Sequence, residues 1–130
     1  MSLDIHIRRT NSRGVAAPAL SFEDDGYYWF LHPLFERLRE QSGKYIDLYG
    51  DAFFTRDDLP RLRTLLSEAE SMARRQPLTW EVHVGTQSHP VKKELYRTVN
   101  REDLLKLIFA FRGLVEAADE NDAQIECIGD

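Results

Sequence analysis

The chain has 130 residues, a length typical of one domain. Apolar residues make up 42% and charged residues 30%, which fits a globular protein and excludes a disordered or collagen-like chain. No apolar run reaches the roughly 18 residues that a membrane-spanning helix needs. Residues 1–6 lack the pattern of a secretory signal. We therefore expect a single domain over residues 1–130, located in the cytoplasm rather than in a membrane.

The charge balance favours some partners over others. The formal net charge is −5, from 17 basic and 22 acidic residues, and residues 116–130 hold six acids and no base. Binding to nucleic acid depends on basic side chains that neutralise phosphates. The balance therefore argues against a nucleic-acid partner and fits a basic protein partner. The only cysteine, Cys127, excludes an internal disulfide and a cysteine-based zinc site.

The first half of the chain predicts two strands, a loop and a helix. Alternating apolar residues predict a strand over residues 3–9, and the Gly, Pro, Asn and Ser content of residues 10–26 predicts a long loop. Residues 27–42 carry one apolar helical face, interrupted at Pro33. Residues 45–49 alternate and predict a second strand. Gly50-Asp51 is typical of a turn, and the pattern of the following Ala52-Phe53-Phe54 is too short to predict an element.

The second half predicts two helices and three strands. Leucine spacing predicts a helix over residues 59–73, and a longer helix follows over residues 101–118. Between them, residues 78–84 and 92–99 predict two strands that could be joined as a hairpin. Residues 123–128 predict a short final strand. No repeat or domain linker interrupts this order.

These elements predict an α+β fold. Alternating strands need cover on only one face, so we expect a two-layer sandwich with a four- or five-stranded, mostly antiparallel sheet and about three helices on one face. The opposite face would be exposed and would carry the polar residues of the predicted strands: Asp4, His6, Arg8, Tyr45, Asp47, Tyr49, Glu81 and His83. This set is either an ordinary solvated face or a binding surface. The two tyrosines favour binding, since tyrosine is enriched at interfaces.

Two apolar residues of the last predicted helix lie outside its core-facing stripe. Leu105 and Phe109 are four residues apart on the nominally polar side. One interpretation is that they are exposed and anchor a partner or a homodimer. The other is that the helix is covered on two sides, so that both residues belong to the core.

Motifs for catalysis are missing from the sequence. There is no Gly-rich phosphate loop, no G-x-S-x-G and no H-E-x-x-H. His6, His83 and Asp47 could form an acid–base cluster, but only if their strands are adjacent. Cys127 has no basic neighbour in sequence and is expected to be buried and inert. We expect neither a metal nor a cofactor.

Three functions fit these observations. The favoured hypothesis is a non-enzymatic protein-interaction or regulatory module, such as a bacterial immunity or antitoxin-like protein that binds a basic partner. Its candidate contacts are Tyr45, Asp47, Tyr49, Leu105 and Phe109. The second is a small enzyme or ligand-binding domain that uses His6, Arg8, Glu81 and His83, with Asp47 and Tyr45 beside them. The third is a structural subunit that dimerises through Leu105 and Phe109.

Overall fold

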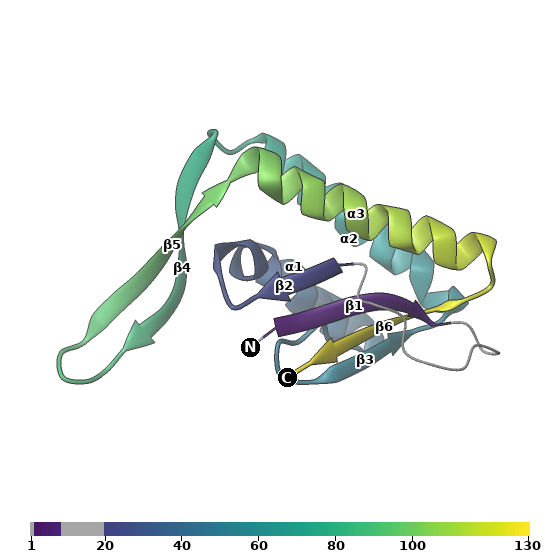
Figure 1. Cartoon of the computed structure of the whole chain (residues 1–130), viewed down its shortest axis with the longest axis horizontal. Coiled ribbons are helices and arrows are strands. Elements are labelled where there is room, and N and C mark those ends of the chain that lie inside the picture. The colour runs from purple at the N-terminus through teal and green to yellow at the C-terminus, as the bar shows by residue number, and fades with distance from the viewer. Residues whose placement is uncertain (1, 9–19) are drawn as a thin grey trace.

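The computed structural model of the protein describes residues 2–8 and 20–130. Four antiparallel strands form one sheet in the order β2-β1-β6-β3, with bounds β1 Ser2–Arg8, β2 Leu20–Glu23, β3 Asp51–Phe54 and β6 Gln124–Gly129. Three helices cover one face of this sheet: α1 Gly26–Ser42, α2 Leu59–Arg74 and α3 Arg101–Glu120 (Figure 1). The predicted α+β class is confirmed. No helix within the described residues is long and apolar enough to cross a membrane.

The core lies between the sheet and the helices. Leu3 and Ile5 of β1 and Ile125 of β6 are fully buried, as alternation along a half-covered strand requires. Phe35 of α1 is also fully buried and meets the Phe22 ring of β2 edge-on, with 6.3 Å between ring centroids. Such aromatic pairs add stability beyond their buried area. The apolar residues of the predicted strands 3–9 and 123–128 and of the predicted helix 27–42 therefore form the buried layer.

α1 and α3 each begin at a residue whose side chain caps free backbone amides. Asp25 accepts hydrogen bonds from the backbone N–H groups of Tyr27 and Tyr28, and α1 then continues through Pro33 to Gly43, where φ is 75°. The 3₁₀ turn η1 (Arg56–Asp58) leads into α2. Asn100 caps α3 by accepting from two backbone N–H groups, at 2.9 and 3.1 Å.

Two stretches differ from the sequence-based expectation. Residues 20–23 form strand β2, although a loop was predicted for residues 10–26; residues 10–19 lie outside the described residues. Residues 45–49 form no strand. Ile46 and Leu48 do point into the core, but the Tyr28 hydroxyl donates to the Ile46 carbonyl at 2.8 Å. The alternate burial of residues 45–49 therefore belongs to a loop that lines the core. The strand that follows this loop is β3.

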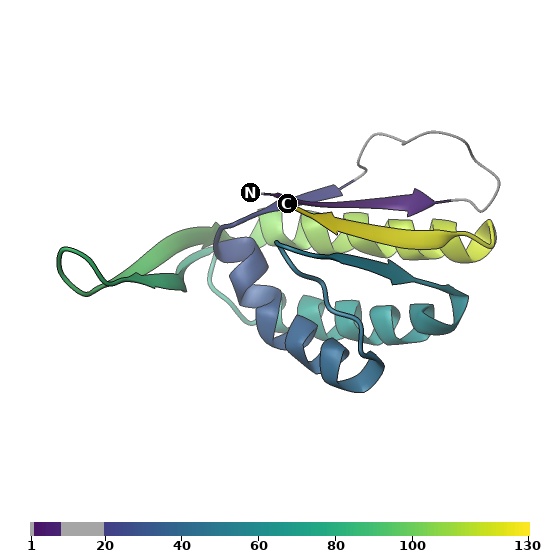
Figure 2. The same ribbon diagram turned by 90° about the horizontal axis from the view of Figure 1, so that it is seen from below.

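The remaining strands, β4 (Thr79–Gln87) and β5 (Lys93–Asn100), pair only with each other within the described part of the chain. We call residues 79–100 the arm, because this hairpin extends away from the sheet and the helices (Figures 1 and 2). The predicted hairpin is confirmed. At its base, Trp80 packs edge-on against Phe30 of α1, with 5.2 Å between ring centroids. A β-bulge lies between His83 and Gly85, and such bulges bend and twist a strand.

Candidate functional site

The loop of residues 43–50, which joins α1 to β3, is fixed tightly against the end of β6. Gly129 donates its backbone N–H to the Gly50 carbonyl at 3.0 Å. A Cβ at Gly129 would lie 2.6 Å from backbone atoms of Asp47 and Leu48. Only glycine permits so close an approach of two backbones. The close contact fixes the position from which the loop presents its outward side chains.

Two aromatic side chains of the loop and of β3 are exposed. Tyr49 is 53% exposed and Phe53 is 42% exposed. Two acidic residues lie in the same segment: Asp51, which is exposed, and Asp47, which accepts a hydrogen bond from the Tyr49 backbone N–H at 3.1 Å. We call Asp47, Tyr49, Asp51 and Phe53 the β3 patch. β3 is an edge strand of the sheet, so the patch lies at a border of the molecule.

A hollow lies along the same border. Its lining includes Lys44, Tyr45, Asp47, Asp51 and Phe53. Lys44 is the only basic residue among these five. Its ammonium group already forms an ion pair with Asp58. The carboxylates of Asp47 and Asp51 make no ion pair within residues 2–8 and 20–130. The β3 patch is therefore aromatic and acidic.

Tyr45, one of the predicted contact residues, is held against α1 instead. Its hydroxyl lies 2.6 Å from His32 Nε2 and donates to Glu36 Oε1 at 3.2 Å, while the Arg39 guanidinium lies 5.1 Å from the ring centroid. Burial raises the pKa of the Tyr45 hydroxyl, and the nearby Glu36 carboxylate raises it further. The arrangement fastens the loop to the helix. Sequence spacing does not connect His32 with Tyr45, so this particular contact was not predicted.

The outer face of the sheet holds a separate polar cluster. His6 Nε2 lies 3.5 Å from Glu126 Oε1, and Arg8 lies 3.3 Å from the other carboxylate oxygen of Glu126. His6 and Glu126 stand opposite each other in the β1–β6 register. His6 is only 7% exposed, and its Nδ1 has no hydrogen-bond partner within the described part of the chain. The cluster combines opposite charges across two strands, which stabilises an antiparallel pair.

The predicted acid–base cluster is not assembled. His83 and Glu81 lie on β4 in the arm, whereas His6 and Arg8 lie on β1 in the four-stranded sheet. His83 forms an ion pair with Glu94 and packs against the Tyr96 ring, with 5.3 Å between ring centroids. The expectation that the first and third predicted strands share one face is therefore wrong. Whether two strands share a face depends on strand order, which sequence spacing does not reveal.

The second predicted contact surface also changes. Leu105 is 6% exposed, whereas Phe109 is 42% exposed and lies beside the guanidinium groups of Arg74 and Arg112. α3 contacts both α2 and the sheet, so its buried arc is wider than one core-facing stripe. The interpretation that the helix is covered on two sides holds for Leu105. An exposed Leu–Phe pair does not exist.

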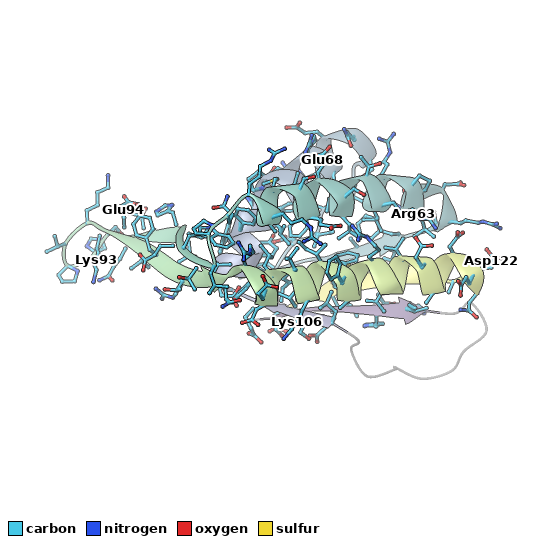
Figure 3. The ribbon with its side chains drawn as sticks, turned by 90° about the horizontal axis from the view of Figure 1, so that it is seen from above. Arg63, Glu68, Lys93, Glu94, Lys106 and Asp122 are labelled. Carbon is cyan, nitrogen blue, oxygen red and sulfur yellow. The ribbon has the colours of Figure 1, made fainter. Side chains whose placement is uncertain are left out.

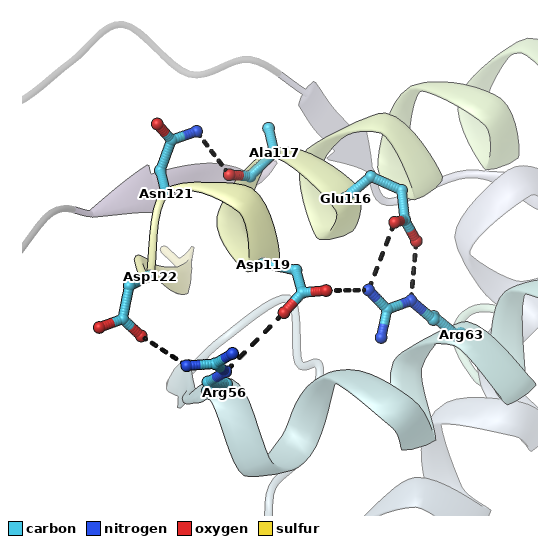
Figure 4. Close-up of polar contacts among 7 residues, drawn as sticks. All are labelled: Arg56, Arg63, Glu116, Ala117, Asp119, Asn121 and Asp122. Atoms are coloured by element: carbon cyan, nitrogen blue, oxygen red, sulfur yellow. Dashed lines mark hydrogen bonds and ion pairs between the residues drawn. The ribbon is translucent and has the colours of Figure 1, made fainter.

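Charges on the helical side of the molecule are largely paired with one another. Arg63 donates to Glu116 at 2.7 Å and to Asp119 at 2.8 Å, and Arg56 lies within 4 Å of Asp119 and Asp122 (Figure 4). The hydrogen bonds from Arg63 hold the pKa of Glu116 below its usual value. Viewed from above, Arg63 lies between α2 and α3 (Figure 3). Glu70, Glu116 and Asp119 are thus paired with nearby arginines, in contrast to the acids of the β3 patch.

Two further candidate chemistries receive no geometric support. Burial strongly raises the pKa of the Cys127 thiol, and the neighbouring Glu126 adds to this, so the reactive thiolate is disfavoured. Among residues 2–8 and 20–130, no three histidine, cysteine, aspartate or glutamate side chains are grouped to hold a metal ion.

Comparison of the chain with protein-family models, curated proteins and solved structures found no significant match. The roles of its residues therefore rest on their geometry alone. Sequence analysis selected Asp47 and Tyr49 of the β3 patch but missed Asp51 and Phe53. Their alternation with Ala52 and Phe54, both buried, was the signal that could have located them.

Proposed function

We propose that the protein is a non-enzymatic protein-interaction module whose β3 patch binds a basic protein partner. The observation that carries the proposal is the exposure of Tyr49 and Phe53 beside the carboxylates of Asp47 and Asp51. An inhibitor of the immunity or antitoxin kind, which blocks a basic protein by complementary charge and shape, fits this chemistry and the net charge of −5.

The aromatic residues would supply the binding energy. Large aromatic side chains are enriched among the few residues that dominate an interface, because they bury a large apolar area with few rotatable bonds. Tyr49 also keeps a hydroxyl for hydrogen bonding. Both residues stand on a rigid support, since the Gly129 contact holds the loop and β6 pairs with β3. A rigid surface loses little conformational entropy on binding.

The carboxylates would supply selectivity and speed of association. An unpaired surface charge contributes more to steering a partner than one that is already neutralised by a neighbour. Asp51 is exposed and has no ion pair among the described residues. Glu70 and Glu116, by comparison, are occupied by arginines of α2 and α3. The acidic character of the chain is therefore accessible to a partner at β3.

Affinity capture from the source cells tests the proposal when the variants are matched. The wild type is compared with Phe53→Ala and Asp51→Lys. Tyr96→Ala on the arm and Glu40→Lys on α1 serve as controls, because they change an exposed aromatic residue and an exposed acid in the same way. We expect one stoichiometric basic protein, retained by both controls and weakened about tenfold or more by each patch variant. Equal retention by all five proteins, or no captured protein, would overturn the proposal.

A further inference from the structure

The two faces of the arm differ in charge. In the β4–β5 register Val82 stands opposite Arg97 and Gly85 opposite Leu95, which places Arg97, Leu95 and Lys93 on one face. The acids of the arm, Glu81 and Glu94, alternate onto the other face with His83 and Tyr96. The first face, which we call the basic face, combines apolar side chains with two cations and no acid.

Among the described residues, contacts cover only the base of the basic face. Val99 is fully buried, and a Cβ at Gly26 of α1 would lie 2.5 Å from its side chain. Further out, Leu95 is partly buried and Lys93 and Arg97 are exposed. A two-stranded ribbon is marginally stable by itself, because it lacks a third element to cover its apolar side. The outer half of the basic face therefore has apolar area and charge left for another surface.

The chain carries a surface of complementary chemistry. The β3 patch pairs two aromatic rings with two carboxylates, and the basic face pairs aliphatic side chains with two cations. Residues 79–100 hold three basic and two acidic residues, whereas the rest of the chain holds 14 and 20. Arm and body thus have opposite net charge, and opposite potentials favour the encounter of one copy's arm with another copy's body.

We propose that the basic face of the arm binds the β3 patch of a second copy of this chain. The inference rests on the proposed binding role of that patch and names a second copy as its partner. Two reciprocal contacts would close a two-fold dimer and double the buried area. Lys93 and Arg97 would face Asp47 and Asp51, while Leu95 would pack on Phe53 or Tyr49. Each ion pair would lie at the rim of an apolar contact, as in other protein interfaces.

A charge-swap series followed by sedimentation velocity tests the inference. The wild type is expected to sediment as a dimer at high protein concentration and as a monomer on dilution. Lys93→Glu and Asp51→Lys should each weaken dimerisation about tenfold, with Arg97→Glu as a second arm variant. Combining Lys93→Glu with Asp51→Lys in one chain should restore most of the affinity, because the contact is re-formed with its charges exchanged. Added salt should weaken the wild-type dimer.

The control is Lys106→Glu, an exposed lysine on α3 away from both surfaces (Figure 3). This variant should dimerise like the wild type. A wild type that stays monomeric at every concentration would overturn the inference. A dimer that tolerates both single reversals would overturn it as well, because another surface would then hold the copies together.

The result also separates this inference from the proposed function. If the protein is monomeric but captures a basic protein that Asp51→Lys loses, the second-copy inference fails and the proposed function stands. If it dimerises with charge-swap rescue and captures no other protein, the arm–patch contact stands and the proposal of a foreign basic partner fails.

Discussion

The four-stranded sheet and the arm are both antiparallel and both alternate apolar with polar residues, yet they bury their side chains very differently. In the sheet, Ile5 and Cys127 are fully buried beneath the helices. In the arm, Tyr96 is 50% exposed, and Val91 at the turn is 71% exposed. The difference lies in what covers each ribbon, since α1 reaches only the arm's base. Alternation indicates a strand, but only the neighbouring elements decide how much of it is buried.

The largest expected contrast is between a core ring and an arm ring. Phe35→Ala should lower the free energy of unfolding by about 3–5 kcal/mol, because it leaves a cavity in the fully buried layer. Tyr96→Ala should change it by no more than about 0.5 kcal/mol, as expected for an exposed side chain. Urea denaturation of both variants measures this. Similar losses would mean that the arm is as tightly packed as the body.

A smaller contrast concerns two glycines. Gly129→Ala should cost about 1–3 kcal/mol, because its Cβ would lie 2.6 Å from backbone atoms of Asp47 and Leu48 and the loop must shift. Gly113→Ala is the matched control on α3, where a Cβ meets nothing within 4 Å. In a helix interior this change should stabilise by up to about 1 kcal/mol. Thermal unfolding distinguishes the two, and a neutral Gly129→Ala would show that the loop is not fixed there.

The junction between the arm and α3 depends on one cap. Asn100→Ala should cost about 1 kcal/mol, because two backbone N–H groups of the first turn lose their acceptor. Asn100→Asp keeps a side-chain oxygen at the cap and should retain most of the stability. Chemical denaturation of both variants checks the role of the cap. Equal losses would assign the effect to packing at the junction rather than to capping.

The smallest expected effect depends on pH. Burial of the Asp58 carboxyl opposes ionisation, but hydrogen bonds from Lys44 and Thr55 outweigh it and lower the pKa below 3.8. Because the pKa of Asp58 is lower in the folded state than in the unfolded state, its carboxylate stabilises the fold above pH 3.8. This stabilisation is lost as the pH falls through the folded pKa. Asp58→Asn should therefore be less stable than the wild type at neutral pH, and the gap should close in acid. A gap that does not change with pH would contradict the ion pair.

Much of the fold could be predicted because it depends on local periodicity. The stripe of α2 and the alternation of β1 and β6 each follow from residues a few positions apart. The strand predicted over residues 45–49 was wrong for a tertiary reason, since the core buries Ile46 and Leu48 whether or not the backbone pairs. The short strand β2 was missed, because four residues show too little alternation to identify a strand.

Less of the candidate site could be predicted from the sequence, because its composition depends on strand order. Asp47 and Tyr49 were selected from a strand pattern that does not exist, yet both belong to the β3 patch. His6 and His83 were grouped on the assumption that one sheet holds all strands, but β4 and β5 pair apart from it. The exposure of Phe53 depends on β3 standing at the edge of the sheet, and sequence spacing carries no information on that position.

Hydrogen exchange at low and high protein concentration tests most directly whether the β3 patch binds the arm of a second copy of this chain. Opening of weakly covered segments is detected amide by amide in this measurement. The account predicts that protection rises with concentration in β3 and in residues 93–97 of the arm, while α2 and α3 stay unchanged. Protection that is independent of concentration, or a rise confined to α2 and α3, would contradict it.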